Sequence, residues 1–178
     1  MAEANDLRII GIDRPGTGMS TQYLYPNIAD FAPDVALLMD DLGVDRFAVV
    51  GLSGGGPYAL SLAHGLPDRV VVAGVLGGVV PNVGDESSEG GVVGFLAPVR
   101  PLLPFISHPL ARVFQVFIKG VKPIGTQALN LFAHFSPEGD QLVFARPEIK
   151  AMFLDDLIGS SRLGIEGPFN DLALFLRP

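Results

Sequence analysis

The sequence predicts an α/β fold, in which a small parallel sheet covered by helices is followed by an all-helical segment. Two observations carry this prediction. Three short apolar runs without polar alternation are separated by helical patterns, as in a parallel sheet buried on both faces. After residue 81, apolar residues recur only at helical spacing. We therefore expect a partial sheet over 1–81, a linker over 82–94 and a helical segment over 95–178.

The first predicted strand covers residues 7–12, a short run rich in β-branched residues. It leads into residues 13–18, Asp-Arg-Pro-Gly-Thr-Gly, whose proline and glycines are typical of a loop. Asp13 stands where strand and loop meet, and we expect it to hold the loop in place.

A helix is predicted over residues 28–42, because apolar residues recur there on one face. Gly43 follows at the position where a left-handed residue commonly ends a helix. Asp30 is the expected N-cap, which leaves Pro33 in the first turn, where no internal N–H bond is lost. The apolar face consists of Ile28, Phe31, Val35, Leu38, Met39 and Leu42.

Two further strands flank a glycine-rich turn. The second predicted strand, 46–52, opens directly onto residues 53–58, Ser-Gly-Gly-Gly-Pro-Tyr. A helix follows this turn and is expected to end at Gly65 and Pro67. The third strand, 70–77, is apolar throughout. This alternation of strand and helix indicates parallel pairing.

The pattern changes after Pro81. Residues 82–94 are rich in glycine and serine and are expected to form the linker. Two apolar stripes at helical spacing follow, and each predicts a helix. The first stripe is Leu110, Val113, Phe114, Phe117, Ile118 and Val121, and the second is Ile149, Phe153, Leu154, Leu157 and Ile158.

Composition excludes several classes of function. The net charge of -7, without clustered lysine or arginine, argues against a nucleic-acid partner. The absence of cysteine excludes disulfides, thiol catalysis and thiolate metal sites. The longest apolar run, 70–81, is shorter than the ~18–20 residues of a membrane span, and the acidic N-terminus does not resemble a signal peptide. We expect a cytoplasmic protein with no membrane span, metal or cofactor.

Residues 51–55, Gly-Leu-Ser-Gly-Gly, follow the pattern G-x-S-x-G. A strand before and a helix after this pattern indicate a nucleophile elbow, a strained turn that raises a serine hydroxyl clear of the sheet. Ser53 is thus the candidate catalytic nucleophile. Gly51 and Gly55 are the small neighbours that let strand and helix approach. The N–H of Gly54 is the candidate oxyanion donor, assisted by the positive end of the helix dipole.

A glycine-rich turn between a strand and a helix can instead bind a phosphate. A P-loop, however, requires Gly-Lys-Ser/Thr after four spacer residues, and no lysine lies near Ser53. A dinucleotide-binding turn requires G-x-G-x-x-G, and Ser53 occupies a position where glycine is needed. The motif therefore favours a nucleophile over a phosphate site.

Two motifs, in this order and at this separation, resemble the α/β-hydrolase fold family. Residues 13–20, Asp-Arg-Pro-Gly-Thr-Gly-Met-Ser, resemble the loop after that family's fourth strand. Residues 51–60 resemble the elbow of its fifth strand, and 68–70 resemble the start of its sixth. The helices after Pro81 resemble the cap that family members insert there. The resemblance implies an incomplete α/β-hydrolase sheet followed by a helical cap.

The resemblance also implies a serine, a histidine base, an acid and two oxyanion donors. Only Ser53 and the Gly54 amide have counterparts in this sequence. In the family, the acid and the histidine follow the seventh and eighth strands, and the second oxyanion donor follows the third strand. We expect these parts to lie outside residues 1–178, so the isolated chain is expected to be inactive.

No local residue is expected to replace them. His64 lies on the same predicted helix as Ser53, about 16 Å along its axis, which is too far for a hydrogen bond. His108 and His134 belong to the cap, where one could lie above the serine, but a solvated or packing role is favoured for each. No carboxylate follows the sixth strand before Asp85. The expected solvated helix charges are Asp40, Asp41, Asp155 and Asp156.

The family's third strand lies between its fourth and fifth. Without it, the strands predicted at 7–12 and 46–52 either pair directly or keep open edges, since a one-strand gap is ~9–10 Å wide. Open apolar edges favour self-association or a complementing partner chain.

Two functions fit these observations. The first is a serine hydrolase acting on a small apolar ester, amide or related substrate beneath the cap. The second is a truncated or divergent chain of the same fold, which is a non-catalytic fragment or a binding module. Phenylalanines of the cap could roof an apolar pocket or form the core of its helices: Phe95, Phe105, Phe114, Phe117, Phe132, Phe135 and Phe153.

Overall fold

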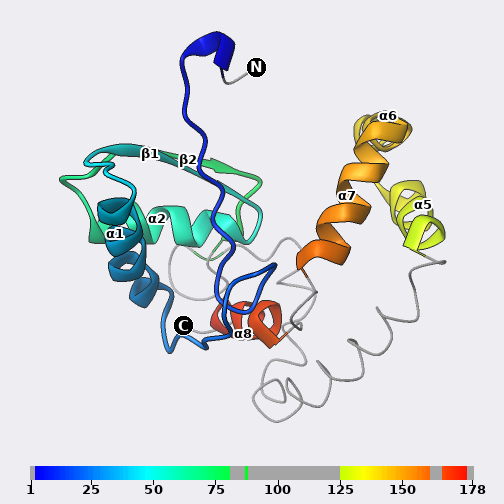
Figure 1. The fold of residues 1–178 in the computed structure, drawn as a ribbon. Coiled ribbons are helices and arrows are strands. Elements are labelled where there is room, and N and C mark those ends of the chain that lie inside the picture. Colours follow the sequence, from blue (N-terminus) through cyan, green and yellow to red (C-terminus); the bar gives the residue numbers. More distant parts are fainter. Residues whose placement is uncertain (1–2, 81–86, 88–124, 161–165, 176–178) are drawn as a thin grey trace. The chain divides into compact units, whose positions relative to one another are not determined.

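The computed structural model describes residues 3–80, 87, 125–160 and 166–175 (Figure 1). The chain divides into two compact units. The sheet unit comprises Leu24–Ser107 and Phe169–Pro178, and the helical unit comprises Met1–Tyr23 and His108–Pro168. Apart from Ser87, the predicted linker lies outside the described residues, as does the predicted helix over 110–121. The three-part domain division stays a prediction.

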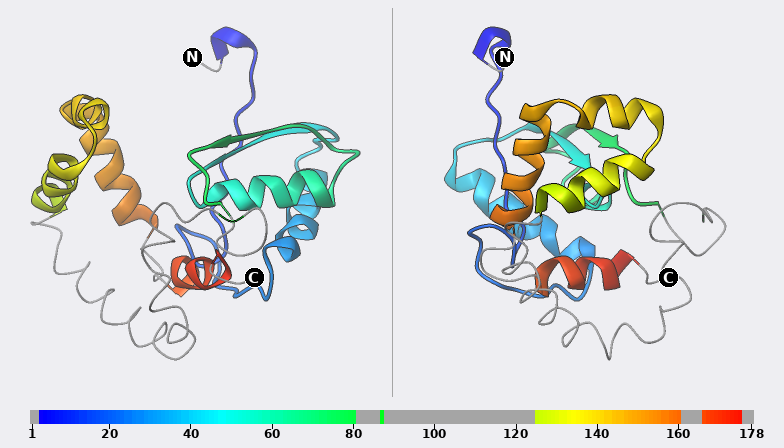
Figure 2. Two further views of the ribbon diagram at one scale, coloured as in Figure 1. Left: turned by 180° about the vertical axis from the view of Figure 1, so that it is seen from behind. Right: turned by 90° about the vertical axis from the view of Figure 1, so that its right-hand side faces the viewer.

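The sheet unit contains two parallel strands joined by a helix. The strands are β1 (Phe47–Leu52) and β2 (Val70–Leu76), and Leu52 lies opposite Leu76 in their register. The connecting helix, α2 (Gly55–Gly65), packs along one face of both strands (Figure 2). The second and third predicted strands and the intervening helix are therefore confirmed.

The strand predicted over residues 7–12 is wrong. This stretch belongs to no helix or strand, and Leu7 and Ile9 are 62% and 75% exposed. A β-branched composition favours extended backbone, but a strand also needs a ladder partner for its N–H and C=O groups. In the described part of the chain, β1 pairs only with β2.

The helix predicted over 28–42 is a short 3₁₀ turn, η2 (Ile28–Asp30), that continues into α1 (Phe31–Asp41). Phe31, Val35 and Met39 are buried, as their spacing predicts. Leu38 is exposed instead, and Ala32 takes its place on the buried face. Gly43 ends the segment in the left-handed conformation, with φ of 65°.

Asp30 occupies the N-cap position of α1 but does not cap the helix with its side chain. Its φ and ψ of -67° and -10° are already helical, because η2 leads directly into α1. An N-cap side chain reaches the first-turn N–H groups from an extended backbone, which Asp30 lacks. Its Oδ2 instead accepts from the Asn27 N–H at 3.0 Å. The N-cap position predicted for Asp30 is therefore confirmed, although its side chain makes no capping hydrogen bond to α1.

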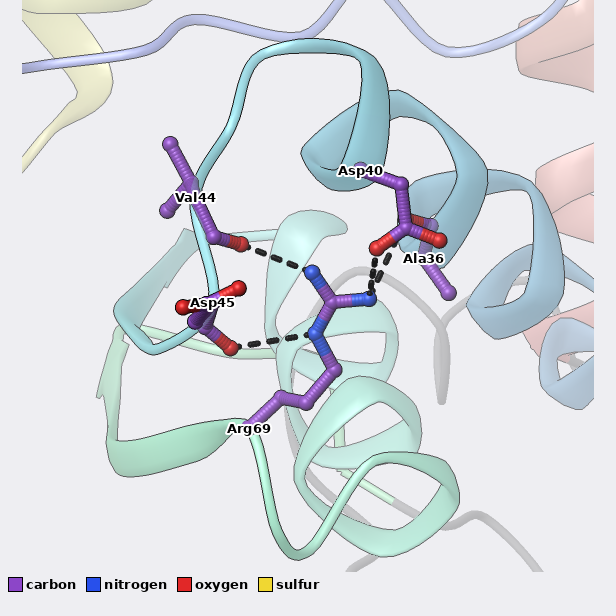
Figure 3. Close-up of polar contacts among 5 residues, drawn as sticks. All are labelled: Ala36, Asp40, Val44, Asp45 and Arg69. Carbon is purple, nitrogen blue, oxygen red and sulfur yellow. Dashed lines mark hydrogen bonds and ion pairs between the residues drawn. The ribbon is translucent and has the colours of Figure 1, made fainter.

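Arg69 joins the start of β2 to α1 and to the loop before β1 (Figure 3). Its Nη2 donates to Val44 O at 2.7 Å, and its Nε donates to Asp45 O at 3.1 Å. Its Nη1 donates to Ala36 O at 3.3 Å and forms an ion pair with Asp40 Oδ1 at 2.6 Å. One guanidinium thereby donates to three backbone carbonyls, two of which, those of Val44 and Asp45, lie in the loop between α1 and β1.

Arg69→Ala is expected to lower the free energy of unfolding by about 2–3 kcal/mol, because partly buried carbonyls lose a charged donor. Arg69→Lys should recover only part of this loss, since an ammonium cannot reproduce the planar fork. Asp40→Asn is the matched control: the Asp40 side chain is 63% exposed, and such a pair contributes about 0–1 kcal/mol. Chemical denaturation of the three variants checks the order. Equal losses for Arg69→Ala and Asp40→Asn would contradict this account.

The face of the sheet opposite α2 is apolar and exposed. Side chains alternate along β1, so that Val49 and Gly51 face α2 while their neighbours face away. We call this outward surface the open face. Its most exposed members are Val50 at 70%, Leu52 at 68%, Val72 at 60% and Leu76 at 57%. A parallel sheet normally has both faces covered, so the exposure of these side chains is unusual.

Three helices of the helical unit pack against one another (Figure 2): α5 (Gly125–Phe135), α6 (Glu138–Phe144) and α7 (Pro147–Ser160). The rings of Phe144 and Phe153 meet edge to face with centroids 5.0 Å apart. The helix predicted from the second apolar stripe is confirmed as α7.

The last helix is α8 (Glu166–Phe175), most of which belongs to the sheet unit. No helix in the described ranges is long and apolar enough to cross a bilayer.

Candidate active site

Ser53 lies in the tight turn between β1 and α2, separated from the helix only by Gly54. Its φ is 51°, a left-handed conformation that non-glycine residues rarely adopt. Its side chain is exposed. The strand, strained turn and helix expected around the G-x-S-x-G pattern are therefore all present.

Three backbone hydrogen bonds hold Ser53 in this conformation. Its N–H donates to Leu76 O at 2.9 Å, which extends the pairing with β2 by one residue. Its carbonyl accepts from the N–H of Gly56 at 3.0 Å and of Val79 at 3.1 Å. A left-handed non-glycine residue costs roughly 1–3 kcal/mol and persists only when its surroundings fix it. Here the helix and the segment after β2 both fix it.

Gly51 is required to be glycine, as predicted. A Cβ there would overlap the Gly55 carbonyl and lie 2.8 Å from the Gly56 nitrogen, and neither backbone group can move aside easily. A Cβ at Gly55 would meet no described atom within 4 Å. The described residues therefore give no steric reason for glycine at position 55, whose backbone faces Gly51.

Sequence reasoning missed the role of Gly56. A Cβ at this position would lie 3.0 Å from Gly78 Cα and 3.0 Å from Val75 Cγ1. The first turn of α2 therefore also lies close to Val75 of β2 and to Gly78 just after that strand. The run of three glycines at 54–56 is the sequence feature that could have indicated this close approach.

Gly54 is the N-cap residue of α2, with φ of -60°. The N–H groups at the start of a helix have no partner within the helix, and the helix dipole places partial positive charge there. Among the described residues, none accepts a hydrogen bond from the Gly54 N–H. This N–H lies next to Ser53 in the chain and is suited to an anionic oxygen.

Sequence reasoning also missed two contacts that α8 makes with this turn, both within the sheet unit. The ring of Phe175 lies against Gly54, so that a Cβ on Gly54 would be 3.1 Å from Phe175 Cε2. The Tyr58 hydroxyl of α2 donates to Oδ1 of Asp171, a buried carboxylate with 8% exposure. No sequence pattern connects residues this far apart.

The described residues do not supply a base for Ser53. No described histidine or carboxylate is hydrogen-bonded to its Oγ. His64 is exposed at the end of α2, as predicted, and His134 is exposed on α5 in the helical unit. His108 and Asp85 lie outside the described residues.

The predicted aspartate roles are mostly confirmed. Asp13 holds its loop: Oδ2 accepts from the Met19 N–H at 3.1 Å, and the main-chain carbonyl accepts from Ser20 Oγ at 2.6 Å. Asp41, Asp155 and Asp156 are exposed on their helices. Asp40 differs, because it forms the ion pair with Arg69. No described cluster of three or more acidic or histidine side chains could hold a metal ion.

Comparison with known proteins agrees with this geometry. The family model of the alpha/beta hydrolase fold matches residues 2–75. An alpha/beta hydrolase fold protein from Nakamurella multipartita shares the fold, with a TM-score of 0.56 and 24% identity over 98% of this chain and 60% of its own. The matched segment and the shared structure together define the class of fold: the chain has an alpha/beta hydrolase fold, which the family model matches over 2–75.

Two curated relatives match parts of the chain. The "Dihydrolipoyllysine-residue acetyltransferase component of acetoin cleaving system" from Cupriavidus necator is 34% identical over 95 residues, which are 53% of this chain and 25% of the relative. A "Putative carbamate hydrolase RutD" from Caulobacter sp. is 40% identical over 65 residues, which are 35% of this chain and 24% of the relative. The chain thus matches only about a quarter of each relative's length.

Proposed function

We propose that this chain carries the nucleophile of an α/β-fold serine hydrolase that acts on a small apolar ester, amide or related carbonyl substrate. The observation that carries the proposal is the left-handed Ser53, held by three backbone hydrogen bonds where β1 meets α2. Strain that the surroundings maintain is typical of functional positions. Exposure of the side chain leaves its hydroxyl accessible to a substrate.

In the proposed reaction, Ser53 Oγ adds to the substrate carbonyl carbon while a base takes its proton. The carbonyl oxygen becomes negative and is stabilised by the Gly54 N–H and the N-terminal end of α2. The leaving group departs with a proton returned from the base, and water then hydrolyses the acyl-serine. The base, the acid and a second oxyanion donor would come from further sequence or from a complementing chain.

The relatives support the carbonyl class of substrate. The name of the Caulobacter relative includes carbamate hydrolysis, and the name of the Cupriavidus relative includes acetyl transfer. We therefore include carbamates among the related substrates.

Helices α5, α6 and α7 are proposed as part of a cap. Phe144 is 8% exposed and packs on Phe153, so we assign Phe144 to the core of the cap, whereas Phe153 is 42% exposed.

The test is covalent labelling by an alkyl fluorophosphonate, with and without added imidazole as an external base. We expect negligible labelling of the chain alone, since no described residue supplies a base, and imidazole-dependent labelling that mass spectrometry maps to residue 53. Ser53→Ala should abolish this labelling. Ser87→Ala, which removes an exposed serine outside the elbow, should not change it.

One observation favours the second candidate function, a non-catalytic fragment or binding module of the same fold: no described base contacts Ser53. Failure of imidazole to promote labelling of the folded chain would favour this alternative. The coding DNA on both sides discriminates further, because a downstream strand followed by Asp and then a Gly-His pair would encode a candidate acid and base.

A further inference from the structure

We propose that Phe175 forms a wall of the substrate site and limits the size of the group bonded to the reacting carbonyl, and that the Tyr58–Asp171 hydrogen bond positions this wall. The proposal rests on the roles assigned to Ser53 and Gly54. Gly54 and Phe175 are complementary in shape, because glycine has no side chain and leaves the space that the Phe175 ring occupies. The ring atoms Cε2 and Cζ lie 3.1 and 3.3 Å from where a Gly54 Cβ would be.

Two pairs of residues dock α8 onto α2. Gly54 and Tyr58 are four residues apart at the start of α2, and Asp171 and Phe175 are four residues apart on α8. Residues at this spacing share one face of a helix. Phe175 meets Gly54, and Asp171 accepts from the Tyr58 hydroxyl, so α8 runs toward the N-terminal end of α2. The Tyr58 and Phe175 rings also meet edge to face, with centroids 6.3 Å apart.

This docking is specific rather than a general apolar contact. A hydrogen bond from a hydroxyl to a buried carboxylate is directional, and leaving the carboxylate without its partner is unfavourable. Asp171 therefore fixes the register of α8 along α2. The same register brings Phe175 beside the elbow. A second contact supports the placement, because Asn170 Nδ2 donates to Tyr25 O at 3.3 Å.

The consequence for a substrate follows from geometry. A carbonyl oxygen that accepts from the Gly54 N–H lies next to the Gly54 α-carbon. A bulky substituent on that carbonyl would meet the Phe175 ring, whereas a small one would pass beside it. The ring also removes water from this side of the oxyanion position, which strengthens the hydrogen bond to the oxyanion.

The absence of cysteine allows a test that needs neither base nor acid. Ser53→Cys introduces a single thiol at the elbow, and its alkylation rates with iodoacetamide and with a bulky diphenyl maleimide are measured. In Ser53→Cys/Phe175→Ala, the bulky-to-small rate ratio should rise about tenfold, the scale on which apolar pockets distinguish sizes. Phe175→Trp should lower it. Leu60→Ala, which truncates a 55% exposed side chain on α2, is the matched control and should leave it unchanged.

The positioning pair is tested in the same assay. Tyr58→Phe keeps the ring but removes the donor, and Asp171→Leu removes the acceptor, so both should raise the ratio. Asp171→Asn retains an acceptor oxygen and should keep the ratio near that of the parent. Unfolding would also raise the ratio, because it removes the wall, so the ratio is compared only among variants that show a cooperative urea transition. An unchanged ratio in both Phe175 variants would overturn the proposal, whereas failure of Ser53 phosphonylation alone would overturn only the hydrolase function.

Discussion

Gly51→Ala is expected to unfold the elbow, with a loss of about 3 kcal/mol or more in the free energy of unfolding, because a methyl group would be forced into backbone. The groups that it would meet are the Gly55 carbonyl and the Gly56 nitrogen. Both belong to the first turn of α2, so relief requires the helix to move away from β1. Imidazole-dependent labelling of Ser53 should be lost together with the stability.

Gly55→Ala is the matched comparison, because it adds the same methyl group where no described atom lies within 4 Å. It should be neutral or stabilise α2 by up to about 1 kcal/mol, since alanine favours helix over glycine. Urea denaturation followed by circular dichroism measures both variants. Similar stability of the two variants would show that β1 and α2 do not approach as closely as described.

The second large effect concerns the open face of the sheet. We expect the chain expressed alone to be insoluble or to bind a hydrophobic dye such as anilinonaphthalene sulfonate strongly, because its outward valines and leucines are exposed. Val50→Thr with Val72→Thr should reduce dye binding severalfold, since both replacements keep the β-branched shape that suits a strand. Dye fluorescence and light scattering measure the change.

Leu37→Gln is the control for this experiment. Leu37 is 67% exposed, similar to Val50, but it lies on α1 and not on the open face. Its replacement should change dye binding little if the contiguous face is responsible. A soluble monomer with a sharp, cooperative thermal transition and no dye binding would contradict the prediction.

The elbow could be predicted from sequence because its determinants are local. An apolar run, a serine between glycines and a helix start lie within about one strand and one turn, and the left-handed residue follows from that arrangement. Gly43 and the loop tied by Asp13 are predicted for the same reason, since each depends on residues only a few positions away.

The errors arise where a local preference depends on a distant partner. Residues 7–12 have strand composition but lack a ladder partner in the described chain. Asp40 has the pattern of a solvated charge, but the fold brings Arg69 to it.

The sequence by itself determined that Ser53 stands at a strained turn between an apolar strand and a helix, because strand, turn and helix preferences act over neighbouring residues. Only the tertiary structure decided what lies beside that turn. Tyr58 and Asp171 are 113 positions apart, and their hydrogen bond, like the Phe175 contact with Gly54, forms when α8 packs on α2. Such contacts depend on the packing of whole helices, which no short pattern of residues specifies.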